Sequence, residues 1–382
     1  MKIFLYLVEA DLTSGASKCA LELISHLKDT NYKPIVITQH KNNFNDFCNK
    51  TGIENYHIHY ARICSLGMGY VGLFIAFFSR FFLNYFALKY LEKKIDFNKV
   101  SFLHSNGSSI DFGAYINKRK KIPHIWHVRD FFLFDKTWHP LVKDFPTYME
   151  KNSTYIITTS NALRNTLIQH NVRPSKIKTI YDGIDFDNSS YESRDFQIVQ
   201  KDVLNVVCVG HICQLKGQSV LIDAIAKMSE SERKCFKFDF YGNFAPGEKT
   251  KIIKKITENN LDANVNFKGC SNNILPTLAS YDIGIQPSHS EGFSRVTAEY
   301  MIAGLCVIAA EEGAIPELIQ NGENGFLYKD YDSTELKGKL LYCYNNQKIM
   351  QKFAYNAKKK AIQSYNLNKN LTHIVELYNE IS

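Results

Sequence analysis

Several kinds of signal are missing from this sequence, and each absence narrows the class of protein. The nine cysteines, an odd number, show no C-x2-C spacing. This argues against a disulfide framework or a zinc site and favours reduced thiols in the cytosol. The apolar run before Glu9 and Asp11 is short, so the start of the chain predicts a first β-strand and no signal peptide. No basic helix or aromatic-interleaved motif suggests binding to nucleic acid. The remaining expectation is a globular protein of the cytoplasm.

One stretch approaches the length of a membrane span. Residues 66–90 are the most apolar part of the chain, but Arg80 and Lys89 fall in their second half. Because a span needs about 20 predominantly apolar residues, we favour a helix that faces a membrane or is partly buried. An ordinary core helix and a true span are the alternatives. Aromatic side chains next to basic ones would suit a helix in the membrane interface. The basic residues in question are Arg80, Lys89, Lys93 and Lys94.

The positive charge is concentrated in the first half of the chain. The formal net charge is +8; residues 1–190 hold 24 basic and 16 acidic residues, whereas residues 191–382 hold 22 of each. A basic excess in one half suggests an anionic partner there. An anionic membrane surface or a lipid-linked pyrophosphate acceptor fits better than nucleic acid. A solvated surface without a partner is the alternative.

Length and pattern predict two α/β domains. A chain of 382 residues is too long for one ordinary core. Strand patterns alternate with helical stretches, which predicts parallel sheets covered by helices on both faces. The polar, turn-rich residues 185–202 read as a linker, so we expect domains at 1–185 and 203–365, a linker at 186–202 and a final helix at 366–382. The predicted strands are 3–8, 34–39, 56–60, 100–104, 124–128, 155–159, 177–181, 203–209, 236–241, 265–267, 283–286 and 306–309.

The chain is organised around residues 281–328. In order, this stretch predicts a strand, a loop, a helix and a second strand, at 282–286, 287–291, 294–303 and 305–310. Gly304 should stop the helix, because glycine adopts the left-handed C-cap conformation at least cost. Glu291 falls in the loop and Glu299 inside the helix, and a separation of roughly 12 Å along the axis prevents them from acting as one paired-carboxylate site.

The start of that helix has the features of a phosphate site. Free backbone N–H groups stand there at the positive end of a helix dipole, which favours an anion. Glycine allows close backbone approach, and an arginine in the first turn is disfavoured unless an anion binds. The residues are Gly292, Phe293, Ser294 and Arg295. Carboxylates on both sides suit hydroxyl groups, so a sugar diphosphate between a ribose and a hexose fits. Taken singly, Glu291 and Glu299 could be ordinary solvated residues.

This stretch resembles the retaining glycosyltransferases of family four, whose signature is a glutamate, seven residues and a second glutamate, here E-G-F-S-R-V-T-A-E. A-G-L-C-V-I-A, G-A-I-P-E-L-I and N-G-E-N-G-F-L-Y also look like that family. The resemblance implies that Glu291 approaches the transferred sugar and that Glu299 holds the ribose. It also implies the GT-B fold, α/β with two doubly wound Rossmann-like domains facing each other across a cleft. The first domain would bind the acceptor and the second the nucleotide-sugar, and the final helix would cross back to the first.

The resemblance extends to two places that would contact the donor phosphates. Lys216-Gly217 begins a helix, as in the family's Lys-Gly pair, but His211 stands where the family usually has arginine. Histidine is mostly neutral at pH 7, so one cation is in doubt and Arg295 could compensate. The small-residue turn at Gly15 suits a phosphate as well. Its match is partial, because Ser14 and Ser17 replace the usual glycine and glutamate.

Two strand ends of the first half carry polar residues. Asn106 ends one strand, and the run H-V-R-D, residues 127–130, ends another. A lone histidine is more often structural, but this run looks like the family's histidine position. The resemblance implies that His127 contacts the donor sugar or the acceptor. Asn106, Arg129 and Asp130 would lie near the acceptor.

The string Asp185-Phe186-Asp187 matches the D-x-D metal motif of the other major glycosyltransferase fold. It lies at the linker and not at a strand end inside a nucleotide-binding domain. We therefore expect no metal and no cofactor besides the nucleotide-sugar.

These observations predict a retaining glycosyltransferase, with Glu291, Lys216 and His127 as catalytic candidates. It would move a sugar from a nucleotide-diphosphate donor, UDP-sugar favoured, to a lipid-linked or oligosaccharide acceptor at the inner face of the plasma membrane. Assembly of a bacterial capsule, O-antigen or exopolysaccharide is the expected setting. A sugar-nucleotide epimerase on the same plan and a sugar-nucleotide-binding protein without activity stay open as alternatives.

Overall fold

The computed structural model describes residues 1–8, 15–61, 63–66, 70–131, 138–186, 200–271 and 273–382. The chain forms two compact units, one of Met1–Gly183 with Asn368–Ser382 and one of Ile184–Leu367. Each unit has its own sheet and is described by itself. Most of the predicted linker lies outside the described residues, as do Ser14 and Asp187.

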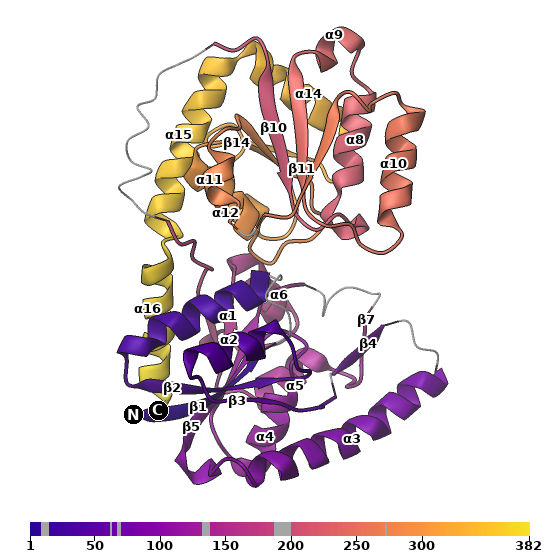
Figure 1. Ribbon diagram of the computed structural model, residues 1–382. Coiled ribbons are helices and arrows are strands. Elements are labelled where there is room, and N and C mark those ends of the chain that lie inside the picture. Colours follow the sequence, from indigo (N-terminus) through magenta and orange to yellow (C-terminus); the bar gives the residue numbers. More distant parts are fainter. Residues whose placement is uncertain (9–14, 62, 67–69, 132–137, 187–199, 272) are drawn as a thin grey trace. The chain divides into compact units, whose positions relative to one another are not determined.

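The first unit contains a seven-stranded parallel sheet of order β3-β2-β1-β5-β6-β8-β9 (Figure 1). Its strands are β1 (Lys2–Val8), β2 (Tyr32–Thr38), β3 (Asn55–His57), β5 (Val100–Asn106), β6 (His124–Val128), β8 (Tyr155–Thr158) and β9 (Ile177–Thr179). The helices between them include α1 (Gly15–His26), α2 (Asn43–Thr51), α3 (Tyr70–Glu92), α4 (Phe112–Lys120), α5 (Phe145–Lys151) and α6 (Asn161–Gln169). The predicted parallel α/β arrangement is confirmed. A short antiparallel pair, β4 (Cys64–Leu66) with β7 (Trp138–Pro140), was not predicted.

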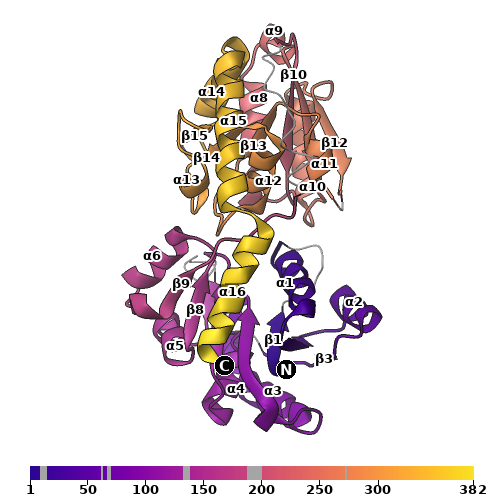
Figure 2. The same ribbon diagram turned by 90° about the vertical axis from the view of Figure 1, so that its left-hand side faces the viewer.

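The two faces of this sheet bury different elements, because successive side chains of a strand point to opposite sides. Leu5 and Leu7 of β1 belong to a buried cluster with Leu88 and Leu91 of α3. On the other face, the rings of Phe4 and Phe102 lie 5.3 and 4.6 Å from the ring of Tyr378. Tyr378 belongs to α16 (Leu367–Ile381), which lies beside this sheet in both views (Figures 1 and 2). The last helix of the chain therefore completes the core of the first unit.

Helix α3 covers most of the apolar stretch singled out in the sequence. Among the described residues, no helix combines the length and the apolar composition that crossing a bilayer requires. Its inward side includes Asn84, Leu88 and Leu91, all buried. Arg80 also turns inward and forms an ion pair with buried Asp111. The expectation that Arg80 joins a row of basic residues at a membrane interface is therefore wrong, because its charge is used inside the protein.

The second unit contains a six-stranded parallel sheet of order β12-β11-β10-β13-β14-β15. Its strands are β10 (Leu204–Val209), β11 (Phe236–Tyr241), β12 (Val265–Gly269), β13 (Ile283–Gln286), β14 (Cys306–Ala310) and β15 (Phe326–Tyr328). The helices include α8 (Gln218–Ala226), α9 (Glu230–Arg233), α10 (Glu248–Glu258), α11 (Leu275–Leu278), α12 (Arg295–Ala303), α13 (Ile315–Leu318), α14 (Ser333–Asn345) and α15 (Gln347–Ser364). Five of the strands were predicted, and β15 was missed.

Helix α12 is held against β10 and β13 by one tyrosine. The backbone N–H of Val209 donates to the Tyr300 hydroxyl at 2.7 Å. Gly284 leaves room for this ring, since a Cβ there would lie 2.5 Å from it. Gly304 ends the helix with a φ of +78°, which confirms the predicted stop. This packing places the start of α12 at the carboxyl end of β13.

Candidate functional site

In the second unit, a cation and a carboxylate meet where β13 leads into α12. The Nζ atom of Lys216 lies 2.6 Å from Oε1 of Glu291, and Nε2 of Gln286 donates to the same oxygen at 2.8 Å. Glu291 is 9% exposed, whereas the Lys216 side chain is 32% exposed. Burial opposes the Lys216 charge, but the attraction of Glu291 outweighs it and raises the pKa of Lys216. The ammonium group is therefore charged and has further N–H donors for a ligand.

Close backbone packing brings these two residues together. The loop after β13 lies on the turn before α8, where the N–H of His289 donates to the carbonyl of Leu215 at 3.0 Å. At Gly217, an added Cβ would lie 1.9 Å from the carbonyl oxygen of Pro287. Gly217 also has a φ of +67°, which favours glycine. The glycine of the Lys-Gly pair is thus required for Lys216 to approach Glu291.

The start of α12 has an unusual backbone conformation. Its N-cap, Ser294, has a φ of +75°, and the Ser294 hydroxyl lies 2.9 Å from that of Thr297. A positive φ costs a non-glycine residue roughly 1–3 kcal/mol and is common at functional sites. Phe293 is buried beside the ring of Tyr365. Gly292 and Arg295 flank these two residues, and Glu299 follows one turn later. His211 is exposed after the end of β10.

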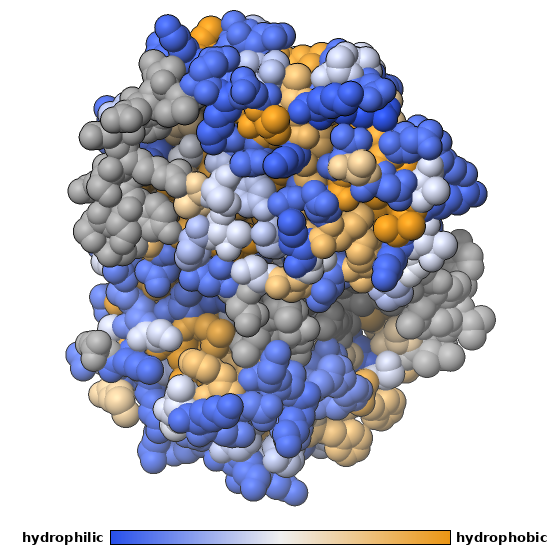
Figure 3. Space-filling model, turned by 45° about the horizontal axis from the view of Figure 1, so that its top comes forward, coloured by the Kyte–Doolittle hydropathy of each residue, from blue (hydrophilic) through white to orange (hydrophobic). Residues whose placement is uncertain are grey.

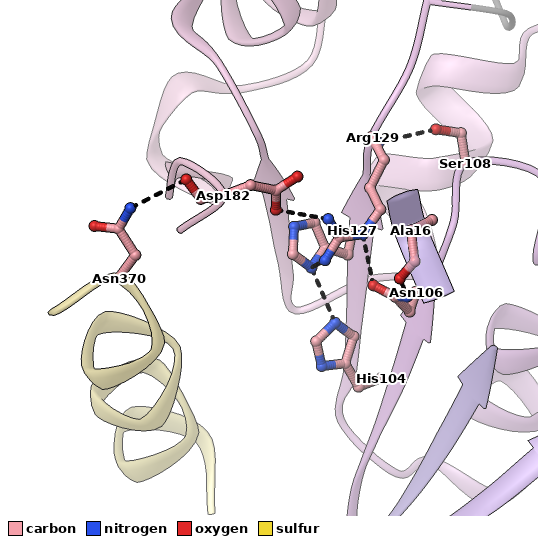
Figure 4. Close-up of polar contacts among 8 residues, drawn as sticks. All are labelled: Ala16, His104, Asn106, Ser108, His127, Arg129, Asp182 and Asn370. Carbon is pink, nitrogen blue, oxygen red and sulfur yellow. Dashed lines mark hydrogen bonds and ion pairs between the residues drawn. The ribbon is translucent and has the colours of Figure 1, made fainter. Parts of the chain in front are cut away.

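In the first unit, Arg129 connects the ends of several strands (Figure 4). Its Nε donates to Oδ1 of Asn106 at 2.6 Å, and its Nη1 donates to Oδ1 of Asp182 at 2.7 Å. Asn106 in turn donates to the carbonyl of Ala16 at 3.1 Å, next to Gly15 at the start of α1. Burial disfavours the Arg129 charge, but Asp182 outweighs this and raises the arginine pKa. Arg129 is therefore a charged residue that holds this edge of the sheet together.

Two buried histidines continue from Arg129 toward α16. Nδ1 of His127 lies 3.4 Å from Nη2 of Arg129 and 3.3 Å from Nε2 of His104. Nδ1 of His104 lies 2.6 Å from the hydroxyl of Tyr378. Burial lowers the pKa of both histidines well below the usual value, and the Arg129 charge lowers each pKa further. Both imidazoles are therefore neutral at pH 7.

Comparison with known proteins finds family models that match both halves of the chain. Residues 13–188 match the family model described as Glycosyltransferase Family 4, and residues 191–360 match that described as Glycosyl transferases group 1. The chain belongs to glycosyltransferase family 4. This membership identifies it as a transferase of sugars, and the roles of its individual site residues stay predictions.

Relatives and solved structures agree with this assignment. The glycosyltransferase is 26% identical to the capsular polysaccharide biosynthesis glycosyltransferase CapH of Staphylococcus aureus, covering 64% of this chain and 66% of CapH. It is 25% identical to the poly(ribitol-phosphate) α-N-acetylglucosaminyltransferase of S. aureus, covering 76% and 57%. The structure of Anabaena HepE in complex with UDP and glucose matches with a TM-score of 0.78 and 21% identity over both whole chains. The predicted GT-B fold class is confirmed.

Three site neighbours were missed in the sequence of this glycosyltransferase. Gln286 and His104 are the last residues of two predicted strands, and a polar residue at a strand end was the available signal. Asp182 is the aspartate of the string Y-D-G, residues 181–183, at the end of the first unit, but nothing there indicated Arg129 as its partner.

The prediction that no metal is bound concerns residues outside the two sets described above. Within the described ranges, no three His, Cys, Asp or Glu side chains converge as a metal site would require. Asp187 of the D-x-D string lies outside those ranges.

Proposed function

We propose that this glycosyltransferase retains the anomeric configuration and transfers a hexose from a UDP-sugar to a lipid-linked saccharide in bacterial surface polysaccharide synthesis. The second unit would bind the donor and the first the acceptor. The observation that carries the proposal is the Lys216–Glu291 pair beside the start of α12. The names of CapH and of the S. aureus poly(ribitol-phosphate) enzyme support the setting, and the HepE complex with UDP and glucose supports the donor.

The chemical problem is the negative charge that develops on the departing diphosphate. Donors fixed in advance around that charge are usually the largest catalytic contribution. Lys216 and the N–H groups of residues 292–295 would supply them, while Glu291 orients the sugar and Glu299 binds the ribose. The bond from the anomeric carbon to the diphosphate oxygen breaks, and the acceptor hydroxyl forms the new bond on the same face. Its proton passes to a diphosphate oxygen, so this scheme needs no protein base and no metal.

Ligand-induced stabilisation tests the donor site directly. Thermal unfolding should be followed with UDP, GDP, ADP and their common sugars, for the wild type and for Glu299→Ala. A ligand at 100 times its dissociation constant adds about 2.7 kcal/mol, which raises the midpoint by several degrees. We expect UDP compounds to shift the wild type and to shift Glu299→Ala much less. Equal shifts in both proteins would contradict the assignment of Glu299. A shift with GDP alone would mean that the donor carries guanine and not uracil.

Membrane attachment is proposed from the outward side of α3. The residues there repeat at intervals of three and four, so they share one face of the helix. This face carries seven exposed aromatic residues: Phe77, Phe78, Phe81, Phe82, Tyr85, Phe86 and Tyr90. Orange side chains lie at the lower right margin in Figure 3, the side on which Figure 1 places α3. An exposed apolar area of this kind marks a partner or membrane surface.

Positive charge beside this face favours an anionic lipid surface as the partner. Lys120 contacts Glu92 at 2.6 Å, which joins the end of α4 to the end of α3. The basic residues around this junction are Lys89, Lys93, Lys94, Lys118, Arg119, Lys120 and Lys121. Aromatic residues flanked by lysines are typical of helices that lie in the membrane interface. A lipid-linked acceptor would be presented at the same surface.

The vesicle experiment alters the basic residues and the aromatic face of α3 in separate variants. Lys89, Lys93 and Lys94 are replaced together with glutamate in one variant, and Phe81, Phe82 and Phe86 with serine in another. Each basic residue near an anionic leaflet contributes about 1 kcal/mol, so the charge variant should bind phosphatidylglycerol vesicles about a hundredfold more weakly. The serine variant should lose binding to neutral and anionic vesicles alike.

The control removes exposed aromatics from the second unit. Tyr342 and Tyr355 are 43% and 50% exposed there, and their replacement with serine should leave vesicle binding unchanged. Binding that is unaffected in both α3 variants would contradict the membrane proposal. Self-association that the α3 serine variant abolishes would identify a second copy of the chain as the occupant.

A further inference from the structure

We propose that Arg129 fixes the tautomer of His127 and that Tyr378 reinforces it through His104, so that His127 presents its Nε2–H group to the substrate. His104 and Tyr378 are positioning residues in this proposal. The three side chains come from β5, β6 and α16, and 274 positions in the chain separate His104 from Tyr378. Only the identity of the group that accepts the Nε2–H bond rests on the proposed function.

The direction of the hydrogen bonds follows from Arg129. A guanidinium group can donate but cannot accept. Because Nη2 of Arg129 lies 3.4 Å from Nδ1 of His127, this nitrogen must offer a lone pair. A neutral imidazole carries one proton, so the proton of His127 is on Nε2. The ion pair with Asp182 at 2.7 Å holds Arg129 in the position that requires this tautomer.

The same reasoning determines the state of His104. Nδ1 of His127 is an acceptor, so the 3.3 Å contact with Nε2 of His104 requires that His104 donates. The single lone pair of this Nδ1 is then shared between Nη2 of Arg129 and Nε2 of His104, in agreement with the long distances of 3.4 and 3.3 Å. Nδ1 of His104 must then accept, and the Tyr378 hydroxyl at 2.6 Å is its donor. Burial raises the pKa of Tyr378 well above the usual value, so the phenol keeps its proton. One set of proton positions satisfies every contact from Tyr378 to Arg129.

The remaining atom of this group is Nε2 of His127. It is buried and has no hydrogen-bond partner among the residues that the structure describes. A buried donor without a partner is costly, and a sugar hydroxyl or a phosphate oxygen of the bound substrate would satisfy it. Because this nitrogen already carries the proton, His127 acts as a hydrogen-bond donor there and cannot act as a base.

Nitrogen NMR of the full-length protein tests the proton positions without any assay of activity. When histidine is labelled with ¹⁵N in the ring, the chemical shift distinguishes a protonated nitrogen from an unprotonated one. The variants His127→Gln and His104→Gln identify the two sets of signals. We expect Nε2 to be protonated in both residues at pH 7. In Tyr378→Phe, His104 should populate the tautomer protonated at Nδ1, and the His127 signals should shift. Turnover should fall about tenfold, as for the loss of one hydrogen bond, with the KM for the donor changed less than twofold.

Tyr32→Phe is the matched control. Tyr32 packs against Tyr378 at 5.3 Å between ring centroids and donates to Asn379 of α16 at 2.7 Å, outside the chain of histidines. It should leave the nitrogen signals and turnover unchanged. A wild-type His127 protonated on Nδ1 would overturn the proposal, as would Tyr378→Phe spectra identical to wild type. Absence of transfer from every donor would reject the proposed function, while the spectra would still decide the tautomer.

Discussion

Replacing Lys216 with alanine is expected to lower kcat/KM for sugar transfer by about 100- to 1,000-fold, the effect of removing one fixed donor from a developing negative charge. The variant loses the ammonium group 2.6 Å from Glu291 and leaves that carboxylate with the Gln286 amide. Steady-state kinetics with the donor identified by thermal unfolding measure this change. Lys216→Arg keeps the charge on a larger, planar group and should recover part of the activity.

Lys201 provides the control for Lys216→Ala. Its Nζ atom lies 2.5 Å from Oδ1 of Asp282, and the two side chains are 41% and 12% exposed. The nitrogen–oxygen distance and the burial of this pair therefore resemble those of the Lys216–Glu291 pair. Asp282, however, precedes β13 and so lies at the opposite end of the sheet. Lys201→Ala should keep kcat/KM within about threefold of the wild type, because surface ion pairs contribute at most about 1 kcal/mol. Equal losses in the two variants would mean that Lys216 acts through stability alone.

Asp182→Ala is expected to destabilise the first unit by about 3–5 kcal/mol, the effect of leaving a buried charge without its partner. The Arg129 and Asp182 side chains are 7% and 13% exposed, so water replaces the lost carboxylate poorly. Both tryptophans of the chain, Trp126 and Trp138, belong to the first unit. Tryptophan fluorescence during urea unfolding therefore reports on that unit.

An exposed ion pair serves as the comparison for Asp182→Ala. Lys99 and Asp96 form an ion pair within the first unit, with side chains 74% and 49% exposed. Lys99→Gln should leave the free energy of unfolding of this unit nearly unchanged, because solvent screens such pairs. A change below about 1 kcal/mol in Asp182→Ala would show that Arg129 finds another partner or reaches water, and would contradict the role given to the pair.

Local patterns were sufficient to predict most strands and helix α12. β6, β11 and β13 begin and end at the predicted residues. In β11, apolar and charged residues alternate, the pattern of a strand with one buried face. β15 was missed, since Phe326–Tyr328 has only three residues and so short a run carries little pattern. β4 and β7 are equally short, and their antiparallel pairing depends on contacts that no local pattern encodes.

The contacts within the candidate sites depended on tertiary structure. The family signature singled out both Lys216 and Glu291, but their ion pair results from the packing of Pro287 on Gly217. Strand alternation places His104 on the same face as Phe102, yet it cannot show that Tyr378 covers that face. Arg129 was predicted to bind the acceptor, and its bond to Asp182 shows that its charge is already balanced within the protein.

The position of α16 has a consequence for how the protein folds as it is synthesised. The helix completes the core around Phe4 and Phe102, and Lys2 donates to the carbonyl of Ser382 at 3.0 Å. At roughly 5–20 residues per second, the ribosome needs about ten to forty seconds to make the chain between Gly183 and Asn368. During that time the area of the first sheet around Phe4 and Phe102 lacks its covering helix. The second unit can therefore finish folding first, although it is made later, and the first unit is completed only after α16 has been made.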